Sequence, residues 1–347
     1  VGYLLIGVGM LVFYLDAAAA IIRRYGNLGR ALGLRWLFGG DIDPEHPKAV
    51  VASTMVIIAN SLGVLAGAVV LVMCLINAYD PQVVLNALVV KNLIYWFGHM
   101  IINATIYASV IAVYELLPRY TRKPYGISRP FLWSWSVSCL FVIIVFPHHL
   151  LMDYAEPRWM LVMGQLVSYA AGFPVFLVTA YGVLTNIYRS NIRWKMPSML
   201  AVLALFGWAA GIVPAIIDGT IRVNRVMHNT QWVPGHFHFY LLLGMVAMFL
   251  GFMTWLGKDQ QSDMMGLAPT AFWLYVIGGV VFVLAFLAAG SASVPRRYAG
   301  HLPEGLAYDR VGSLGAGLAG LGGGRRVIQF LARLPRLARA PLALSPT

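Results

Sequence analysis

Residues 228–238 read HNTQWVPGHFH and lead into an apolar run that extends from 234 to about 257. A helix rises about 1.5 Å per residue, and the hydrocarbon layer of a bilayer is about 30 Å thick. The run is therefore long enough to cross a membrane as a helix. His236 and His238 lie at its start, and an ionisable side chain in a membrane segment is unfavourable to bury. Both histidines are therefore candidates for function.

The chain as a whole is also strongly apolar. Of its 347 residues, 60% are hydrophobic and only 11% are charged, whereas soluble domains carry about 25% charged residues. This composition indicates lipid surroundings, with too few polar residues for a sizeable soluble domain. Seven further runs of spanning length occur at about 2–22, 48–78, 84–117, 130–152, 158–188, 196–221 and 269–291.

A spanning segment must satisfy its own backbone hydrogen bonds, and a helix does so. The sequence thus predicts an all-α polytopic membrane protein with about eight transmembrane helices, within residues 1–305. Residues 306–347 form a tail that is Gly-rich from 312 to 324 and basic thereafter. The tail is expected to be a weak ninth helix, an amphipathic surface segment or a disordered end.

The net charge of +12 comes from basic residues in short loops between the runs and in the tail. No basic face is interleaved with aromatic residues, so the sequence does not indicate nucleic-acid binding. The loops after the first, third and fifth runs are the basic ones, and the positive-inside rule places them in the cytoplasm. Four arginines on the outer side break this pattern, and anionic groups near that surface would explain them: Arg222, Arg225, Arg296 and Arg297.

Five of the eight histidines lie within apolar runs, and the expected topology places all five in the outer half of the bilayer: His99, His148, His149, His236 and His238. Isolated hydrogen bonds between helices do not explain five histidines at compatible depths. His236 and His238 are two residues apart, so they project roughly 200° apart on a helix. They cannot chelate one metal together, but they can ligate two different irons, as two hemes on either side of one helix would require.

The histidines at 148 and 149 follow Pro147, which lacks an N–H group and can bend a helix. With His99 they offer three imidazoles, a ligand set that suits copper or zinc. For the His–His pair taken alone, a polar patch at the membrane interface is the alternative interpretation.

Four segments together resemble subunit 1 of the heme–copper oxidase superfamily, in particular its B-type branch. They are residues 95–99 (YWFGH), 146–149 (FPHH), 228–238 and 294–297 (VPRR), and they occur in the family's order at family-like separations. The combination is specific, although no single segment is.

The resemblance implies two hemes and one copper ion. His236 would ligate the iron of a high-spin heme, and His238 would ligate that of a low-spin heme. The copper ion, opposite the high-spin iron, would be held by His99, His148 and His149. The heme propionates would lie beside His228, Asn229, Arg296 and Arg297.

The resemblance also implies partners and a location. A partner subunit, with a copper site through which electrons arrive, would deliver electrons from a cytochrome c-like or other donor. Membrane lipid would surround the bundle, in a bacterial or archaeal cytoplasmic membrane.

One departure from the family concerns the low-spin heme, which has two axial histidines in relatives, the second on an early helix. Here no further histidine lies in a span, because His46 and His301 are in loops. The run that starts at Val1 resembles the family's fourth helix. The first three helices are therefore expected on a missing portion or on a companion chain.

A second departure concerns the electron acceptor. Oxygen-reducing members of the branch have a Tyr four residues after the first copper ligand, which supplies a proton and an electron. Asn103 stands there and supplies neither, and Tyr107, one turn further along, is the candidate substitute. Groups for a proton path are also few, with Val110 and Val175 where B-type oxidases tend to have Tyr and Ser. The sequence favours reduction of nitric oxide to nitrous oxide, and oxygen reduction as a B-type cytochrome c oxidase is the alternative.

Two other classes of protein compete with a terminal reductase. A non-catalytic heme-handling membrane protein would bind heme without copper and would leave the His148–His149 pair unexplained. A transporter or channel would depend instead on ionisable residues such as Asp16, Lys91 and Asp218, each of which is weaker support than five ordered histidines.

Overall fold

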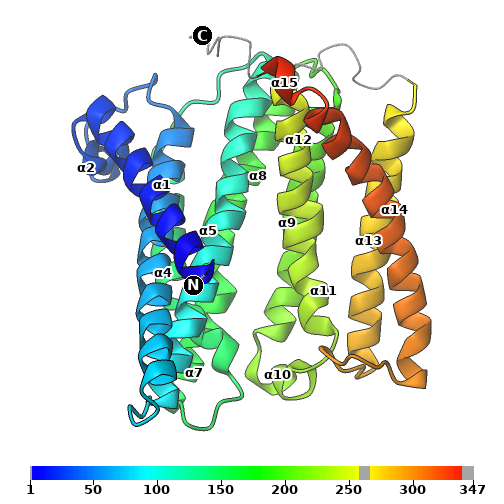
Figure 1. Cartoon of the computed structure of the whole chain (residues 1–347). Helices are drawn as coiled ribbons and strands as arrows, with labels where there is room; N and C mark the ends of the chain where they lie inside the picture. The colour runs from blue at the N-terminus through cyan, green and yellow to red at the C-terminus, as the bar shows by residue number, and fades with distance from the viewer. Residues whose placement is uncertain (1, 258–265, 338–347) are drawn as a thin grey trace. The chain divides into compact units, whose positions relative to one another are not determined.

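The computed structural model describes residues 2–257 and 266–337, which form helices joined by loops (Figure 1). Within these ranges, eight helical segments are long and apolar enough to cross a membrane. They are α1 (Gly2–Tyr25), α4 (Lys48–Tyr79), α5 (Ala87–Thr121), α6 with η1 (Arg129–Ile144, Phe146–Leu150), α7 with α8 (Arg158–Ala171, Phe173–Ile187), α9 (Met196–Asp218), α11 with η2 and α12 (Trp232–His238, Phe239–Val246, Ala247–Leu256) and α13 (Ala268–Ser291). The predicted all-α polytopic fold is confirmed, and the boundaries fall close to those expected from the apolar runs.

Shorter elements connect these segments or follow them: α2 (Leu28–Ala31), α3 (Leu34–Leu37), α10 (Ile221–Met227), η3 (Pro303–Gly305), α14 (Leu306–Leu331) and α15 (Leu334–Leu337). η1 and η3 are 3₁₀ turns, and η2 is a π-helical stretch. β structure within the described residues is limited to one isolated bridge, between Thr230 and Pro295.

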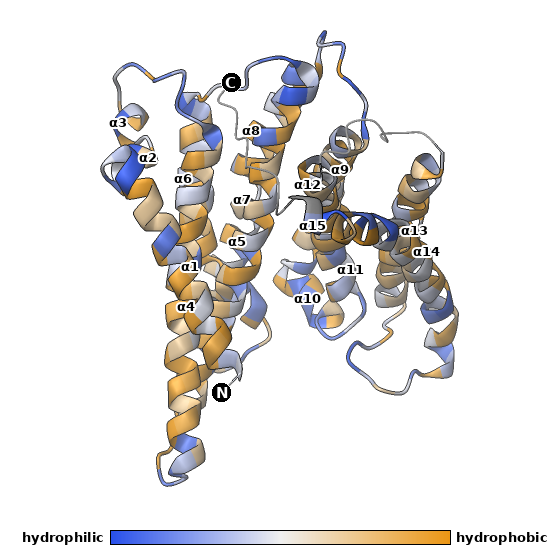
Figure 2. Cartoon of the chain, turned by 45° about the horizontal axis from the view of Figure 1, so that its top comes forward, coloured by the Kyte–Doolittle hydropathy of each residue, from blue (hydrophilic) through white to orange (hydrophobic). Residues whose placement is uncertain are grey.

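Hydropathy follows the helices, since their middle sections are hydrophobic and hydrophilic residues gather in the loops (Figure 2). Large apolar side chains are exposed on the helix surfaces. In α1 only Tyr14 is buried, whereas Leu5 and Phe13 are more than half exposed. Lipid solvates such a surface and water does not. The chain is therefore an integral membrane protein.

The chain forms two compact units. Unit 1 comprises Val1–Tyr114, Pro124–Tyr188 and Ile216–Arg225, and unit 2 comprises Glu115–Lys123, Arg189–Ala215 and Val226–Thr347. Both α5 and α9 contribute residues to each unit.

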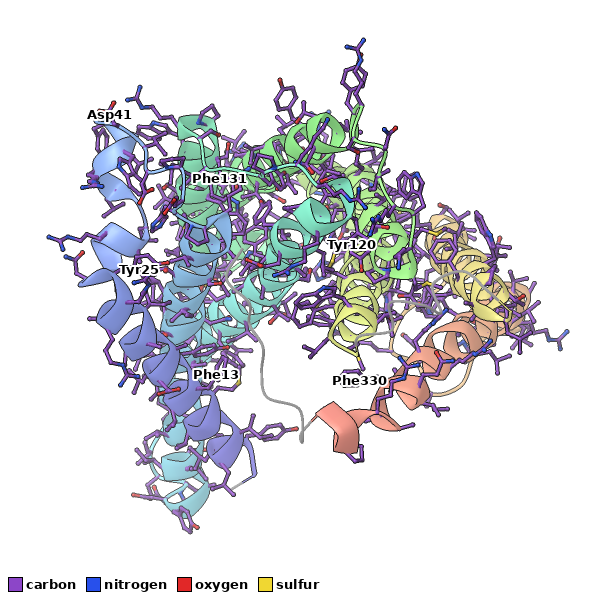
Figure 3. The ribbon with its side chains drawn as sticks, turned by 90° about the horizontal axis from the view of Figure 1, so that it is seen from above. Phe13, Tyr25, Asp41, Tyr120, Phe131 and Phe330 are labelled. Carbon is purple, nitrogen blue, oxygen red and sulfur yellow. The ribbon has the colours of Figure 1, made fainter. Side chains whose placement is uncertain are left out.

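In unit 1, α4 packs against α1 and α6, and α6 packs against α7 and α8. At one end of the unit, the buried Lys48 begins α4 and lies over three aromatic rings. Its Nζ is 3.5 Å from the ring centroid of Tyr125, 4.9 Å from that of Phe131 (labelled in Figure 3) and 5.7 Å from that of Tyr114. This cation–π attraction joins α4, α5 and α6 at that end.

In unit 2, α13 packs along α14 and against α11. Small residues line the α13–α14 contact, where Gly278 faces the backbone of Gly315 and Ala319. Such residues allow two helix backbones to approach closely. The tail is thus helical over 306–331, whereas its residues 338–347 lie outside the described part of the chain.

Candidate metal centre

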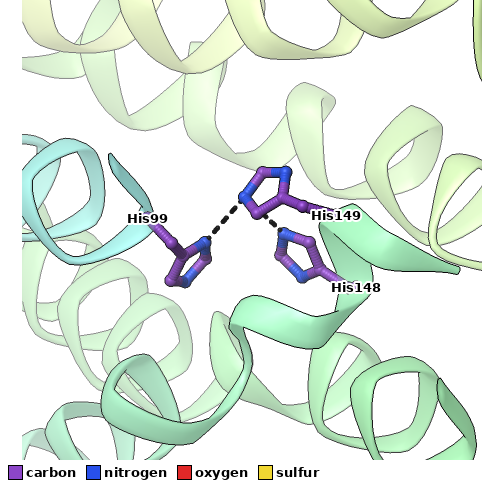
Figure 4. Close-up of side chains that lie close together, drawn as sticks. All are labelled: His99, His148 and His149. Atoms are coloured by element: carbon purple, nitrogen blue, oxygen red, sulfur yellow. Dashed lines mark hydrogen bonds between the residues drawn. The ribbon is translucent and has the colours of Figure 1, made fainter. Parts of the chain in front are cut away.

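Three histidines of unit 1 converge between α5 and η1 (Figure 4). His99 comes from α5, and His148 and His149 come from η1. The Nδ1 atom of His99 lies 3.0 Å from Nε2 of His149, which lies 3.1 Å from Nε2 of His148. One ligand nitrogen from each residue lies within 4.8 Å of the other two. These three residues are called the histidine cluster below, and His148 with His149 the histidine pair.

The histidine cluster fits a metal ion of the copper or zinc type. Imidazole nitrogens bind such ions at about 2.0 Å, which in a tetrahedral site separates them from one another by about 3.3 Å. Two of the three separations, 3.0 and 3.1 Å, are close to this value, and the three ligand nitrogens all lie within 4.8 Å of one another. Three protein ligands leave a fourth position for a reacting molecule, as in catalytic metal sites.

Local sequence explains how the histidine pair is presented. Pro147 has no N–H group with which to continue α6, so the α-helix ends at Ile144 and a 3₁₀ turn follows. α7 packs directly on this turn at Gly164, where a Cβ atom would lie 2.8 Å from the backbone nitrogen of His148. Only glycine therefore allows α7 to approach the histidine pair so closely.

Asn103 lies one helical turn beyond His99 and contacts it. Its Nδ2 atom is 3.0 Å from Nε2 of His99 and donates a hydrogen bond to the His99 backbone oxygen at 3.1 Å. The side chain that replaces the family's tyrosine is therefore in direct contact with a residue of the histidine cluster. An amide at this distance can orient the ring of His99, and it cannot supply a proton.

Tyr107, the candidate substitute for the missing tyrosine, is directed elsewhere. Its hydroxyl donates to the backbone oxygen of Ala171 at 3.4 Å, and its ring meets that of Trp135 edge-on at 5.6 Å. These contacts join α5 to α6 and to the end of α7. Its role in catalysis stays a prediction.

Tyr95 was not singled out from the sequence, yet its ring stacks on that of His149, with centroids 5.6 Å apart and planes inclined by 21°. Its position four residues before His99 places it on the same face of α5. This spacing of four residues could have indicated the contact from the sequence, because a side chain one turn from a metal ligand can reach the other ligands.

In unit 2, α11 is helical over Trp232–His238, so His236 and His238 project from opposite sides, as expected from the sequence. The ring of His238 stacks on Phe286 of α13 at 5.4 Å. Its Nδ1 atom lies 2.6 Å from the backbone oxygen of Pro234 and must donate the hydrogen bond. The proton is therefore on Nδ1, which leaves the Nε2 lone pair for a metal.

Residues 229–231 and 294–296 run side by side in unit 2, next to the start of α11. The backbone N–H of Gln231 donates to Val294 O, and that of Arg296 donates to Asn229 O, both at 2.9 Å. These bonds bring together the four residues that the resemblance associates with heme propionates: His228, Asn229, Arg296 and Arg297.

The electrostatics of this region suit a carboxylate ligand. Burial lowers the pKa of His228, and the positive charges of Arg296 and Arg297 lower it further. The imidazole is therefore neutral at neutral pH, and the guanidinium groups provide the positive charge. Guanidinium groups bind carboxylates through strong, charge-assisted hydrogen bonds.

Each of the two histidine groups belongs to its own unit, the histidine cluster to unit 1 and His236 with His238 to unit 2. That a copper ion in the cluster faces an iron on His236 stays a prediction. Two loop histidines have partners of their own, since Nε2 of His46 lies 2.9 Å from Ala31 O and Nδ1 of His301 lies 2.6 Å from Asp309 Oδ2.

Eight spanning helices with a three-histidine cluster define a polytopic membrane metalloprotein. The chain belongs to the family described as Cytochrome C and Quinol oxidase polypeptide I, whose model matches residues 1–316. Subunit I proteins of this family carry two hemes and one copper ion. Membership places the chain in the cytoplasmic membrane of a prokaryote.

Curated relatives are cytochrome c oxidase subunits 1. That of Thermus thermophilus is 26% identical, with 96% of this chain and 65% of the relative covered. That of Cereibacter sphaeroides is 24% identical, with 76% and 47% covered. A solved heme-copper terminal oxidase dimer has the same fold, with a TM-score of 0.65 at 20% identity over 85% of this chain and 57% of that one. The chain thus spans less than two thirds of the length of these relatives.

Proposed function

We propose that this chain is the catalytic subunit of a heme–copper reductase that converts nitric oxide to nitrous oxide. Two molecules of nitric oxide, two electrons and two protons give one nitrous oxide and one water. The observation that carries the proposal is the contact between Asn103 and His99, at the position where oxygen-reducing members of the branch have a tyrosine. The coupling of two nitric oxide molecules does not depend on a tyrosine side chain as the source of a proton and an electron.

The two histidine groups would supply the ligands of the copper ion and of the two heme irons. The histidine cluster would hold the copper ion, His236 the high-spin heme iron and His238 the low-spin heme iron. When bound, the hemes and the copper would supply the electrons for reduction of a diatomic gas. The chain itself orients these ligands, through Asn103 at His99 and through the Pro234 carbonyl at His238. The propionates would be bound by Arg296 and Arg297 with His228 and Asn229.

Proton supply is consistent with a reaction that consumes few protons. In unit 1 the hydroxyl of Tyr114 lies 2.7 Å from Oγ1 of Thr179 and accepts a hydrogen bond from Trp135 at 3.0 Å. Val110 and Val175, however, are both buried and bring apolar side chains to positions where B-type oxidases tend to have hydroxyl groups. A proton path interrupted in this way suits an enzyme that pumps little or nothing.

Oxygen reduction is the second candidate function, and the names of the relatives favour it, since they are subunits of cytochrome c oxidases. In that case another group must replace the missing tyrosine. Tyr107 is the first candidate, although its hydroxyl is bonded to Ala171. A heme-handling protein without copper is disfavoured, because it gives no reason for the three imidazoles to converge.

The partners are also part of the proposal. A companion chain or a further portion of the subunit would supply the second axial histidine of the low-spin heme. A donor subunit with a copper site of its own would pass electrons from a cytochrome c-like or other donor.

The proposal is tested on the purified membrane complex that contains this chain. Consumption of nitric oxide and of oxygen is measured with electrodes in the presence of an electron donor, and copper and iron are measured in the same sample. Rapid loss of nitric oxide with little oxygen uptake is expected. Rapid oxygen uptake with slow nitric oxide loss would assign the second function, and a complex with two hemes and no copper would refute both.

A further inference from the structure

One face of α5 is tied to the loop that follows the histidine pair. Near the start of α5, Lys91 forms an ion pair with Asp153. One residue later, Asn92 Nδ2 donates a hydrogen bond to Oε1 of Glu156 at 2.6 Å. These two contacts are called the α5 clamp below. Both acidic residues lie between η1 and α7, so the clamp connects the end of the histidine-bearing turn to the helix that carries His99.

The ion pair is coupled to η1 through a single tight turn. Asp153 Oδ1 accepts the backbone N–H of Ala155 at 2.9 Å, while its Oδ2 accepts from Lys91. The backbone N–H of Asp153 donates to the oxygen of Leu150, the last residue of η1, at 2.8 Å. A displacement of Lys91 is therefore transmitted directly to the end of the turn that carries the histidine pair.

The second contact of the clamp joins a partly buried amide to a buried carboxylate. Glu156 is only 7% exposed, and a buried carboxylate is unfavourable without a polar partner. Asn92 provides that partner, and its Nδ2 atom also donates to the backbone oxygen of Leu88 at 3.0 Å, which fixes the amide on its own helix. A hydrogen bond from an amide that is fixed on its own helix to a buried carboxylate holds its geometry better than an ion pair of a long, flexible lysine does.

The histidine pair needs such support from outside. A 3₁₀ turn has poorer hydrogen-bond geometry than an α-helix and does not hold long segments by itself. Before the pair, Trp96 Nε1 donates to the backbone oxygen of Ile143 at 2.9 Å. After the pair, the α5 clamp provides the second point of attachment. The segment is therefore held on both sides by α5, the helix that supplies the third histidine.

We infer that the α5 clamp positions the histidine pair against His99 and so determines how tightly the histidine cluster holds its metal. Lys91 and Asn92 are thus positioning residues that contact no ligand atom of the metal. The inference rests on the proposed copper site. Outer groups that orient metal ligands typically change metal affinity by about 10- to 100-fold when removed. Loss of both contacts is expected to weaken copper binding by about 10-fold, at the lower end of that range, because His99 itself stays in place.

The test compares variants of the purified complex. Lys91→Ala combined with Asn92→Ala removes both contacts, whereas Lys91→Arg keeps a cation beside Asp153 and leaves its bond to Ala155 intact. Arg158→Ala is the matched control, because Arg158 is exposed at the start of α7 and is in no ion pair among the described residues. It removes one positive charge from the same end of unit 1 without touching the clamp.

Two readouts are independent of gas turnover. The first is copper per heme, before and after incubation with a Cu(I) chelator. The second is backbone hydrogen exchange of residues 146–156, measured with and without copper. The double alanine variant should lose copper faster and exchange faster in this segment only, whereas Lys91→Arg and Arg158→Ala should behave like the parent complex.

The inference is overturned if the double alanine variant keeps both the copper retention and the exchange rates of the parent. A complex that contains no copper even as the parent would instead refute the proposed function. Hydrogen exchange would then still decide whether the clamp orders the histidine pair. A variant that loses heme and exchanges faster throughout would show general unfolding and would also contradict a local positioning role.

Discussion

The Nδ2 atom of Asn103 lies 3.0 Å from Nε2 of His99, one turn along the same helix. Asn103 is the residue in which the chain differs from oxygen-reducing members of the branch that it resembles, and this contact joins it to a residue of the histidine cluster. A group so placed acts on the orientation of the ring and on the space beside it. We therefore expect the proposed reaction to depend on an amide where oxygen-reducing members of the branch have a phenol.

Replacement of Asn103 by Leu should impair the proposed reaction without unfolding the protein. Leucine has the same number and branching of side-chain heavy atoms but cannot hydrogen-bond to His99, so nitric oxide turnover is expected to fall by about 10-fold. Heme content and thermal midpoint should stay near those of the parent, because Asn103 is only partly buried. The measurement is nitric oxide consumption with the optical spectrum of the hemes, and unchanged turnover would show that the amide has no role.

Removal of either member of the histidine pair should abolish copper binding selectively. His148→Ala or His149→Ala leaves two imidazoles, too few for a stable site of this type. Copper per chain is expected to fall to near zero while both hemes are retained. His301→Ala, which removes a histidine outside the cluster, serves as the control and should keep its copper. Equal copper in the variants and in the control would exclude the cluster as the copper site.

The two histidines of α11 should ligate different hemes. His236→Ala is expected to remove the high-spin heme, and His238→Ala the low-spin heme, because the side chains project from opposite sides of the helix. Each variant should therefore contain one heme in place of two, with different absorption spectra. The pyridine hemochrome assay measures the number of hemes per protein, and absorption spectra of the reduced protein show which heme remains. Two variants with the same residual heme would contradict the assignment.

A side chain at Gly290 should disturb the contact between α11 and α13. A Cβ atom there would lie 2.1 Å from the backbone nitrogen of Trp232, which begins α11. Gly290→Ala is expected to destabilise the protein by about 1–3 kcal/mol and to lower its heme content. The thermal midpoint in detergent and the heme-to-protein ratio measure the two effects.

Gly317→Ala in α14 is the matched control for this change. Nothing lies within 4 Å of a Cβ atom at that position, and alanine favours a helix more than glycine does. The control should therefore be neutral or stabilising, by up to about 1 kcal/mol. A similar loss of stability in both variants would mean that close packing at Gly290 is not the cause.

The fold could be predicted from the sequence because one physical condition dominates it. An apolar segment in lipid must satisfy its backbone internally, so each long apolar run had to be a helix. The opposite projection of His236 and His238 also followed from the chain alone, since residues two apart on any helix point in nearly opposite directions. Family-like spacing of the four motifs then identified the family, which the match over residues 1–316 confirms.

Contacts between distant segments, apart from those that the four family motifs implied, were beyond reach of the sequence. The sequence indicated no partner for Lys91, because its bond to Asp153 is made across a separation of 62 residues. The stacking of Tyr95 on His149 and the burial of Lys48 among aromatic rings arise in the same way. Such pairs depend on which helix faces another and at what rotation, which no local pattern encodes.

The sequence by itself determined that the chain crosses a membrane as helices and that its histidines belong to a heme–copper family. Both conclusions follow from local rules, namely hydropathy, helical periodicity and motif spacing. Only the tertiary structure decided how closely His99 approaches the histidine pair, that Asn103 touches His99 and that α5 holds the turn on both sides. The reason is that a metal site is made by packing, because its ligands converge only after helices distant in sequence have docked against one another.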